Sequence, residues 1–376
     1  MAAPRLLRVC ILLGISLVLI LGLRGFMKRP TQRESSVPKV GVAQRKAAGT
    51  VERESTPKAR VHALIRSSLE DFRSNPDPAQ AVVLLRTLRD GIRQAPEEEA
   101  AAAIVAFLKT GDDGPTGLPF VVGPDGMMEA APSVRSALLD LLPSLDPVAA
   151  LEVAREIMDQ QTSADEYALA LRNMAWNDLD GDLKSELSAR FMDLLKSPWL
   201  DQPSAGFLEA FDIAVDVGGG PMFDRLVALA GEATVKSNTA ASRAAFMSLD
   251  RMIVRDRALL TAAFSADAGW MEFAPLQRAS LMSRLDLTEP AQREVFSRYL
   301  AATSHAAGEL EYFAKVFPNE NFLYGHRLVT ANEATPTIDE VKAADVRVVA
   351  ELDTLEATVP DEAKGAIRKI RERLKR

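Results

Sequence analysis

Short amphipathic segments recur from residue 61 to the C-terminus, and this recurrence constrains the fold more than any other feature of the chain. The segment that begins at Asp146-Pro147 is typical. Aspartate suits a helix N-cap, and proline suits the first helical turn because its missing N–H would have no partner there. Four apolar residues then fall on one helical stripe: Val148, Leu151, Ala154 and Ile157. The pattern predicts an amphipathic helix.

Other segments carry comparable start signals. Asp77-Pro78 and Glu289-Pro290 repeat the acid–proline pair, while Ser163–Glu166 and Thr337–Glu340 have the spacing of a capping box. Alanine and leucine are abundant and strand-like alternation is scarce, which favours helix. Roughly twelve to fifteen helices of this size fit between residues 61 and 376. The sequence therefore predicts an all-α fold.

Many short helices joined by short turns favour antiparallel helix pairs stacked in series, as an α-solenoid or superhelix. In this respect residues 60–330 resemble HEAT-like α-helical repeat proteins, although no fixed period of about 40–47 residues can be laid over the letters. An irregular compact helical bundle is the alternative. We assign residues 59–330 to a helical repeat-like domain and residues 331–376 to a C-terminal helical hairpin with a basic end.

The first 29 residues predict a membrane anchor. Fifteen residues from Val9 to Leu23 carry no charge, and Arg8 and Arg24 can extend toward lipid headgroups. No small-residue cleavage site follows the apolar run, so an uncleaved signal anchor is favoured over a signal peptide. We expect residues 6–23 to form a single transmembrane helix and residues 30–58, which are polar and proline-dotted, to form a flexible basic tether.

Charge is divided unevenly along the chain. Residues 1–60 carry 12 Lys and Arg against 3 acids, whereas residues 61–337 carry 24 against 40. An acidic body is repelled by phosphate backbones, which argues against nucleic acid as a partner, while a basic tether suits an anionic membrane surface. Because a very short N-terminal tail usually stays inside, the body is expected on the extracytoplasmic side.

Alternating aspartates provide a weak metal candidate. Asp178, Asp180 and Asp182 can offer carboxylate oxygens to calcium. An EF-hand loop starting at Asp178 would need glycine at its sixth position and glutamate at its twelfth, and both are missing. The alternative is an inter-helix turn after Trp176-Asn177, in which Asp182 caps the next helix.

A long loop at residues 110–132 is the second candidate. It holds five glycines and four prolines, and loops of this length are often functional. Phe120–Val122 and Met127-Met128 can pair as a small hairpin around Gly123–Gly126. Phe120 and Asp125 are its interaction candidates. The alternative is a structural cover whose apolar tip packs on the domain.

Aromatic residues cluster near the end of the array, where five of the chain's 22 fall between residues 312 and 324. Together with a neighbouring histidine and arginine they can form an interaction hot spot. The candidates are Tyr312, Phe317, Phe322, Tyr324, His326 and Arg327. The alternative is that these side chains anchor the end of the helical array.

The sequence predicts no catalytic residue and no cofactor. His62, His305 and His326 are isolated from one another, and nucleotide-binding and hydrolase motifs are missing from the chain. The favoured interpretation is a membrane-anchored helical scaffold that binds another protein, with a small-molecule substrate left open. Two alternatives are kept: an α/α-type hydrolase or lyase acting on polysaccharide, and a calcium-binding module.

Overall fold

The computed structural model describes residues 56–74, 77–267, 269–303, 305–319, 325–331 and 333–375. This part of the chain is all-α apart from one small hairpin. The helices are α2 Pro57–Ser74, α3 Pro78–Arg93, α4 Glu97–Leu108, α5 Val134–Leu141, α6 Pro147–Gln160, α7 Ala164–Trp176, α8 Lys184–Leu194, α9 Ala205–Glu209, α10 Asp212–Val217, α11 Gly220–Val235, α12 Thr239–Arg255, α13 Ala258–Ala266, α14 Pro275–Met282, α15 Pro290–Ala301, α16 Glu309–Val316, α17 Ile338–Leu355 and α18 Asp361–Leu374. The strands are β1 Val121–Val122 and β2 Met128–Ala130, and two short 3-10 turns cover Leu142–Ser144 and Pro198–Leu200.

Several predicted helix starts are confirmed. The Asp77 and Asp146 carboxylates accept hydrogen bonds from backbone N–H groups of α3 and α6, and proline follows each of them. Thr337 and Glu340 form a complete capping box at the start of α17. These starts were predictable because a cap depends on neighbours in the sequence alone.

Two local predictions were wrong. Ser163 caps α7 by accepting from the Glu166 N–H, but the Glu166 carboxylate does not close the box because it binds Arg135 of α5 instead. Asp182 does not cap α8. In that turn the Asp178 side chain accepts from the Leu183 N–H, which orders the segment just before the helix.

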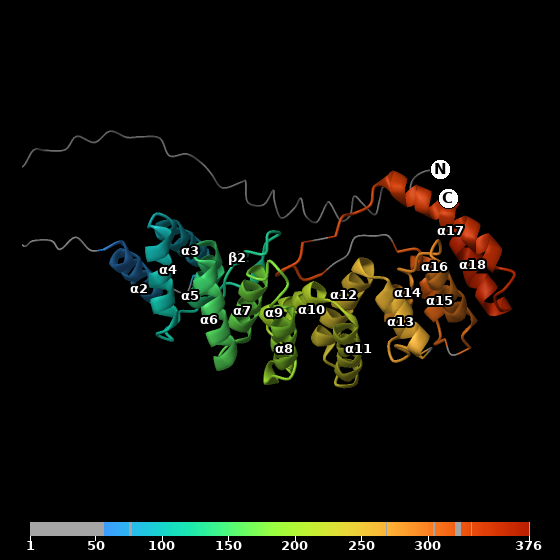
Figure 1. The fold of residues 1–376 in the computed structure, drawn as a ribbon, viewed down its shortest axis with the longest axis horizontal. Helices are drawn as coiled ribbons and strands as arrows, with labels where there is room; N and C mark the ends of the chain where they lie inside the picture. The colour runs from blue at the N-terminus through green and yellow to red at the C-terminus, as the bar shows by residue number, and fades with distance from the viewer. Residues whose placement is uncertain are drawn as a thin grey trace, which may run out of the picture. The chain divides into compact units, whose positions relative to one another are not determined.

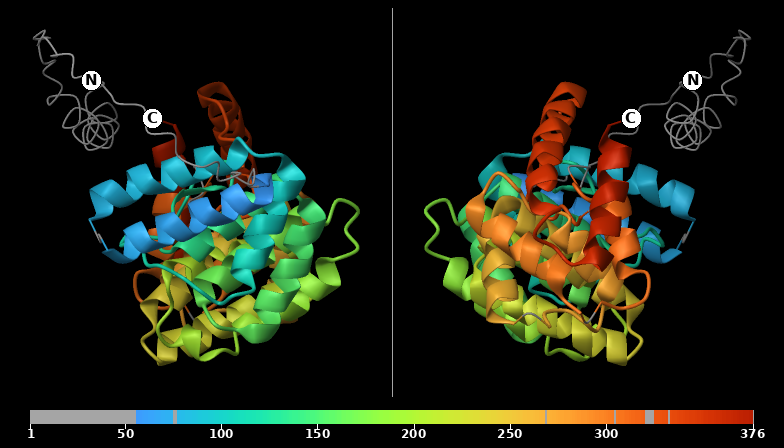
Figure 2. Two further views of the ribbon diagram at one scale, coloured as in Figure 1. Left: turned by 90° about the vertical axis from the view of Figure 1, so that its left-hand side faces the viewer. Right: turned by 90° about the vertical axis from the view of Figure 1, so that its right-hand side faces the viewer.

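Many helices of the array pack on a chain neighbour, on the helix two further along, or on both. Contacts of the second kind link α2 to α4, α5 to α7, α7 to α9, α8 to α10, α10 to α12, α12 to α14 and α14 to α16. Within this body the helices follow one another in chain order (Figures 1 and 2). The C-terminal pair α17 and α18 pack on each other, and α18 also packs on α16.

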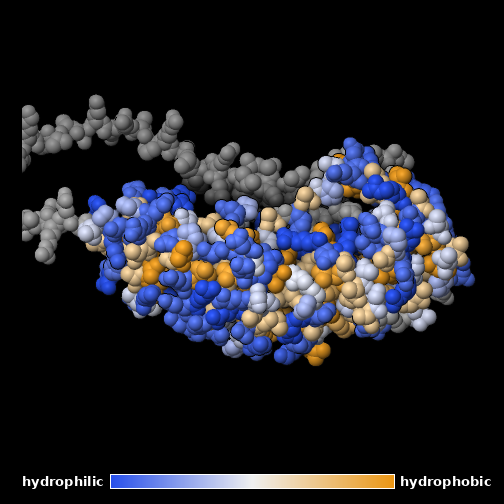
Figure 3. Space-filling model, viewed as in Figure 1, coloured by the Kyte–Doolittle hydropathy of each residue, from blue (hydrophilic) through white to orange (hydrophobic). Residues whose placement is uncertain are grey.

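The stripe predicted from sequence for α6 is only partly correct, because Ala154 and Ile157 are buried and Leu151 is half-buried, but Val148 is 67% exposed. In α3 the buried residues are Ala81, Leu85, Leu88 and Ile92, and in α6 they are Ala150, Val153, Ala154, Ile157 and Met158. Hydrophilic residues cover most of the face drawn in Figure 3, with smaller apolar patches between them. Burial of apolar area at about 25 cal/mol per Å² is the main stabilising contribution to such a body.

The hydroxyl groups of two tyrosines in the core are expected to resist deprotonation at high pH. Burial raises the pKa of Tyr167 to about 12, and its hydroxyl donates to the Arg190 carbonyl oxygen at 2.9 Å. Burial, with the negative charge of Glu309, raises the pKa of Tyr299 further. Both values exceed the unfolded value of about 10. Their stabilising contribution is complete below about pH 10 and is lost as the pH rises through the folded pKa.

We therefore expect both phenols to stay protonated in the folded chain at pH ~11 and to ionise in urea at that pH. Absorbance of tyrosinate measures this directly. Tyr167→Phe should remove one phenol from the urea-dependent increase. An equal tyrosinate signal in folded and unfolded protein would contradict the expectation.

Candidate functional site

Three aspartate–arginine pairs join consecutive elements of the array at similar sequence separations. They are Asp140–Arg172 from α5 and α7, Asp212–Arg251 from α10 and α12, and Asp250–Arg284 from α12 and the residues after α14. Partners are 32, 39 and 34 residues apart. We call them the first, second and third clamps, because the first two hold a non-helical piece of backbone from elsewhere in the chain.

The first clamp holds the loop at residues 110–132. Arg172 donates to Asp140 at 2.6 Å and to the Gly126 carbonyl oxygen at 2.9 Å. Asp140 in turn accepts from the Met128 N–H at 2.9 Å. Both clamp side chains are at most 1% exposed. An aspartate accepting an N–H and an arginine donating to a C=O therefore bind the backbone of the loop from both sides.

The second clamp holds residues 325–331, which we call the return segment (Figure 1). Asp212 accepts from the N–H groups of Val329 and Thr330, each at 2.7 Å. Arg251 donates to Asp212 at 2.6 Å and to the carbonyl oxygens of His326 and Ala331. The chemistry is that of the first clamp, applied to a segment about 80–120 residues away in the sequence.

Glu333 strengthens the second clamp from outside. It accepts hydrogen bonds from Arg251 at 3.0 Å and from Arg255 at 2.9 Å. Burial acts to raise the pKa of Glu333, but the hydrogen bonds from these arginines outweigh it and the net pKa is lowered. Glu333 is therefore ionised at neutral pH, and Arg251 lies between two carboxylates.

At two positions the segments held by the clamps come so close to neighbouring atoms that a side chain would not fit without a shift. A Cβ on Gly325 would lie 2.3 Å from the Cδ of Arg251. A Cβ on Gly126 would lie 3.0 Å from the Leu328 carbonyl oxygen, and the φ of Gly126 is +79°. The second contact shows that the loop held by the first clamp and the return segment meet beside each other.

The third clamp lies in an open pocket. Arg284 donates to both carboxylate oxygens of Asp250, at 2.9 and 2.8 Å, and to the Asn319 carbonyl oxygen. Asp250 is 21% exposed, whereas the aspartates of the other two clamps are at most 1% exposed. The pocket has a volume of about 740 Å³ and lies between α11, α12 and α14.

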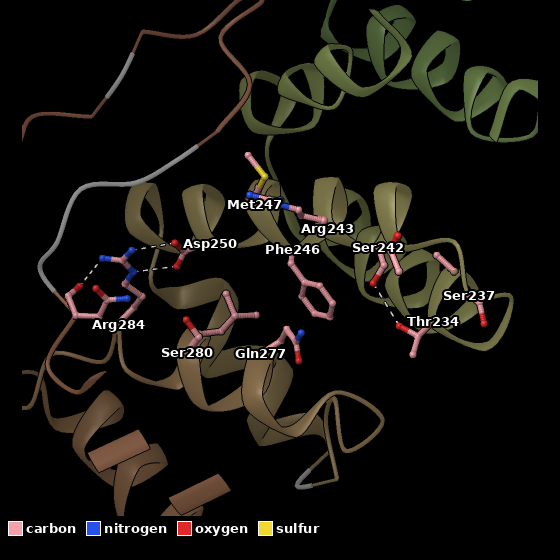
Figure 4. A pocket seen from close by; sticks show the side chains of 14 residues that line it. Thr234, Ser237, Ser242, Arg243, Phe246, Met247, Asp250, Gln277, Ser280 and Arg284 are labelled. Carbon is pink, nitrogen blue, oxygen red and sulfur yellow. Dashed lines mark hydrogen bonds and ion pairs between the residues drawn. The ribbon is translucent and has the colours of Figure 1, made fainter. Parts of the chain in front are cut away.

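Figure 4 shows how the pocket is lined. Phe246 projects from α12 toward Gln277 and Ser280 of α14, and the Asp250–Arg284 pair closes one end. Thr234 and Ser242 share a hydrogen bond toward the other end, at 3.3 Å. Arg243 is exposed at the rim, and among the described residues it makes no hydrogen bond or ion pair. The pocket therefore offers an apolar wall, hydroxyl groups and one positive charge.

A second set of ion pairs has a similar spacing, with the arginine before the acid in the sequence. Arg135–Glu166, Arg155–Glu186 and Arg278–Glu309 are each 31 residues apart, and each has two N–H···O bonds. Sequence reasoning missed both sets because it searched for a period in apolar letters. The sequence pattern that would have predicted them is an arginine with a glutamate 31 residues later, or with an aspartate 32–39 residues earlier.

The loop candidates are placed as follows. The predicted hairpin is confirmed, since β1 and β2 are antiparallel neighbours. Phe120 is 7% exposed and lies against Gly206 of α9. Asp125 is exposed, and its carboxylate accepts from the Met127 N–H at 3.1 Å. The position of Phe120 supports the alternative in which this tip is a structural cover.

The aromatic candidates separate into different environments. Phe317 is fully buried and packs against Phe296 and Phe313, with ring centroids 5.0 and 5.1 Å apart. Tyr312 is partly buried against the same core. His326 and Arg327 belong to the return segment, where the His326 imidazole and the Arg327 N–H both contact the Glu209 carboxylate at 3.2 Å. Phe322 and Tyr324 lie outside the described residues.

The metal and membrane candidates received no support. Asp180 and Asp182 are exposed in the turn before α8, and no group of three or more His, Cys, Asp or Glu in the described part of the chain is placed to hold a metal ion. No described helix is long and apolar enough to cross a bilayer. The proposed anchor at residues 6–23 and residues 30–55 of the proposed tether lie outside the described residues. The predicted end of the tether at residue 58 is wrong, because Pro57 and Lys58 form the start of α2.

Acid–base chemistry would need a carboxylate that is free to carry a proton. The buried acids Asp140, Glu166, Asp212 and Glu309 are each paired with an arginine. Burial nevertheless raises the pKa of Asp212, opposed by hydrogen bonds from Thr330 and by the charge of Arg251. Burial also raises the pKa of Asp216 of α10, opposed by Lys184 and reinforced by Asp212, and no ion pair to Asp216 is seen among the described residues. It is the position to which the polysaccharide-enzyme alternative would assign a general acid.

Comparison with protein families, curated proteins and solved structures found no match to this chain. The class of protein is therefore argued from the clamps and the pocket.

Proposed function

We propose that this chain is a membrane-anchored helical scaffold that binds another protein along an α-solenoid of the HEAT-like kind. The observation that carries the proposal is the second clamp, where Asp212 and Arg251 bind N–H and C=O groups of a non-helical segment. Packing between helices that are next or next but one along the chain supports the solenoid. Binding by backbone groups is suited to extended protein segments.

In this proposal residues 6–23 span the membrane and residues 30–58 tether the body on the extracytoplasmic side. The uncharged run and the basic residues around it support the anchor. A chain of 29 residues has a root-mean-square extent of about 30 Å if it behaves as a random coil. The body could then reach partners close to the membrane surface.

Membrane fractionation tests the anchored part of the proposal. The full chain with a C-terminal tag should pellet with membranes, keep its N-terminal sequence, and lose the tag when protease is added to spheroplasts. A soluble band that begins after Gly25 would show a cleaved signal peptide and would overturn the anchor.

Photo-crosslinking in living cells tests the scaffold part. A photoreactive residue is placed in turn at Val82, Val148 and Gln277, the first two being exposed on α3 and α6 and the third lining the pocket. We expect at least one position to give a discrete crosslinked band of fixed mass. No band at any of these positions would count against a stable protein partner.

A further inference from the structure

The pocket at the third clamp repeats a site whose other two copies are filled by the chain itself. In the first two clamps the aspartate accepts a backbone N–H and the arginine donates to a backbone C=O. In the third, Arg284 donates to the Asn319 C=O, but among the described residues Asp250 accepts from Arg284 alone. Within the described chain, the Asp250 carboxylate therefore accepts no hydrogen bond from a backbone N–H.

We propose that this pocket binds an extended, acidic segment of a partner protein, with a backbone N–H of that segment donating to Asp250. This inference rests on the proposed scaffold function and names its binding site. A carboxylate can accept more than one hydrogen bond on each oxygen, so the Arg284 pair leaves room for a further donor.

The size of the pocket fits this occupant. Its α12 lining runs from Thr239 to Asp250, which is about 16 Å along a helix that rises 1.5 Å per residue. About five residues of extended chain cover the same length at roughly 3.3 Å each. Phe246 and Leu281 provide an apolar wall for one of their side chains.

The charge of the pocket lining determines which kind of peptide segment it favours. Asp250 and Arg284 carry opposite charges, and Arg243 is the other charged side chain on the described part of the lining. A positive rim favours an aspartate or glutamate in the ligand. It disfavours the chain's own residues 30–58, which are predominantly basic. Another protein, rather than the tether, is therefore the expected occupant.

A displayed library of random seven-residue peptides, selected on the full chain in detergent micelles, provides the probe. We expect enriched peptides to combine one acidic with one apolar residue. Synthetic versions should bind Arg243→Glu at least tenfold more weakly than the unaltered chain by fluorescence anisotropy. Arg86→Glu, an exposed arginine on α3 with no partner among the described residues, is the matched control and should change binding less than twofold.

Methylation of single peptide nitrogens tests the backbone contact. One or two positions should lose at least tenfold in affinity, since N-methylation removes the N–H that Asp250 would accept. Failure to enrich peptides over empty micelles, equal binding to Arg243→Glu, or indifference to every N-methyl group would each overturn the inference. Crosslinks at Val82 or Val148 without one at Gln277 would also overturn it while leaving the scaffold proposal intact.

Discussion

Arg172→Met is expected to lower the free energy of unfolding by about 3–5 kcal/mol, because it leaves the Asp140 carboxylate buried without its main partner. Arg172 is 0% exposed and also donates to Gly126 and Asn173. Arg89 still contacts Asp140 at 3.1 Å, which places the expected loss toward the lower end of that range. Urea unfolding followed by circular dichroism measures the change.

Arg155→Met is the matched control. Arg155 makes an ion pair with Glu186 through two hydrogen bonds, but its side chain is 41% exposed. Exposed ion pairs contribute about 0–1 kcal/mol, so this variant should unfold almost as the unaltered chain does. Equal losses for the two variants would show that burial of the first clamp is not what makes it important.

Replacing both residues of the first clamp separates two contributions to the loss of stability: the unpaired buried charge of Asp140 and the lost packing of Arg172. Asp140→Leu together with Arg172→Met should recover part of the loss seen with Arg172→Met alone, since apolar pairs of similar volume often replace buried ion pairs without penalty. Arg172 also lies 4.2 Å from the centre of the Trp176 ring, so the fluorescence of Trp176 should change in each variant.

Local features of this fold were predictable from sequence, whereas the clamps were not. The caps at Asp77, Asp146 and Thr337 depend on residues within three positions, and the loop hairpin depends on Gly123–Gly126. The same locality explains the error at Ser163. The capping motif was read correctly, but a buried arginine from α5 binds Glu166 more favourably than the helix end does.

The clamp partners lie more than thirty residues apart, so no local rule connects them. Aspartate and arginine are residue types that lie mostly at protein surfaces, and they are seldom fully buried unless they are paired. His326 and Arg327 were chosen from sequence as part of an aromatic cluster. The structure places them instead in a segment that binds α9 and α10 through backbone groups. Backbone contacts of this kind cannot be predicted from the type of side chain.

Arg251→Met is expected to release the return segment, with trypsin cleaving after Arg327 roughly a hundredfold faster than in the unaltered chain. Arg251 binds Asp212, two carbonyl oxygens of the segment, Thr330 and Glu333, so its loss removes most of the donors that hold residues 326–333. A loss of about 3 kcal/mol in the opening equilibrium corresponds to that factor. Native-state proteolysis follows the opening equilibrium when closing is faster than cleavage.

Arg255→Met provides the control, since Arg255 contacts Glu333 and Ala331 but is 38% exposed. Its cleavage rate should rise no more than about fivefold. Cleavage after Arg225, within α11, reports whether the whole body has opened instead. An unchanged rate after Arg327 in Arg251→Met would mean that Glu209 and side-chain packing hold the segment. The second clamp would then not be what holds the segment, and the inference about the third clamp would lose one of its two examples.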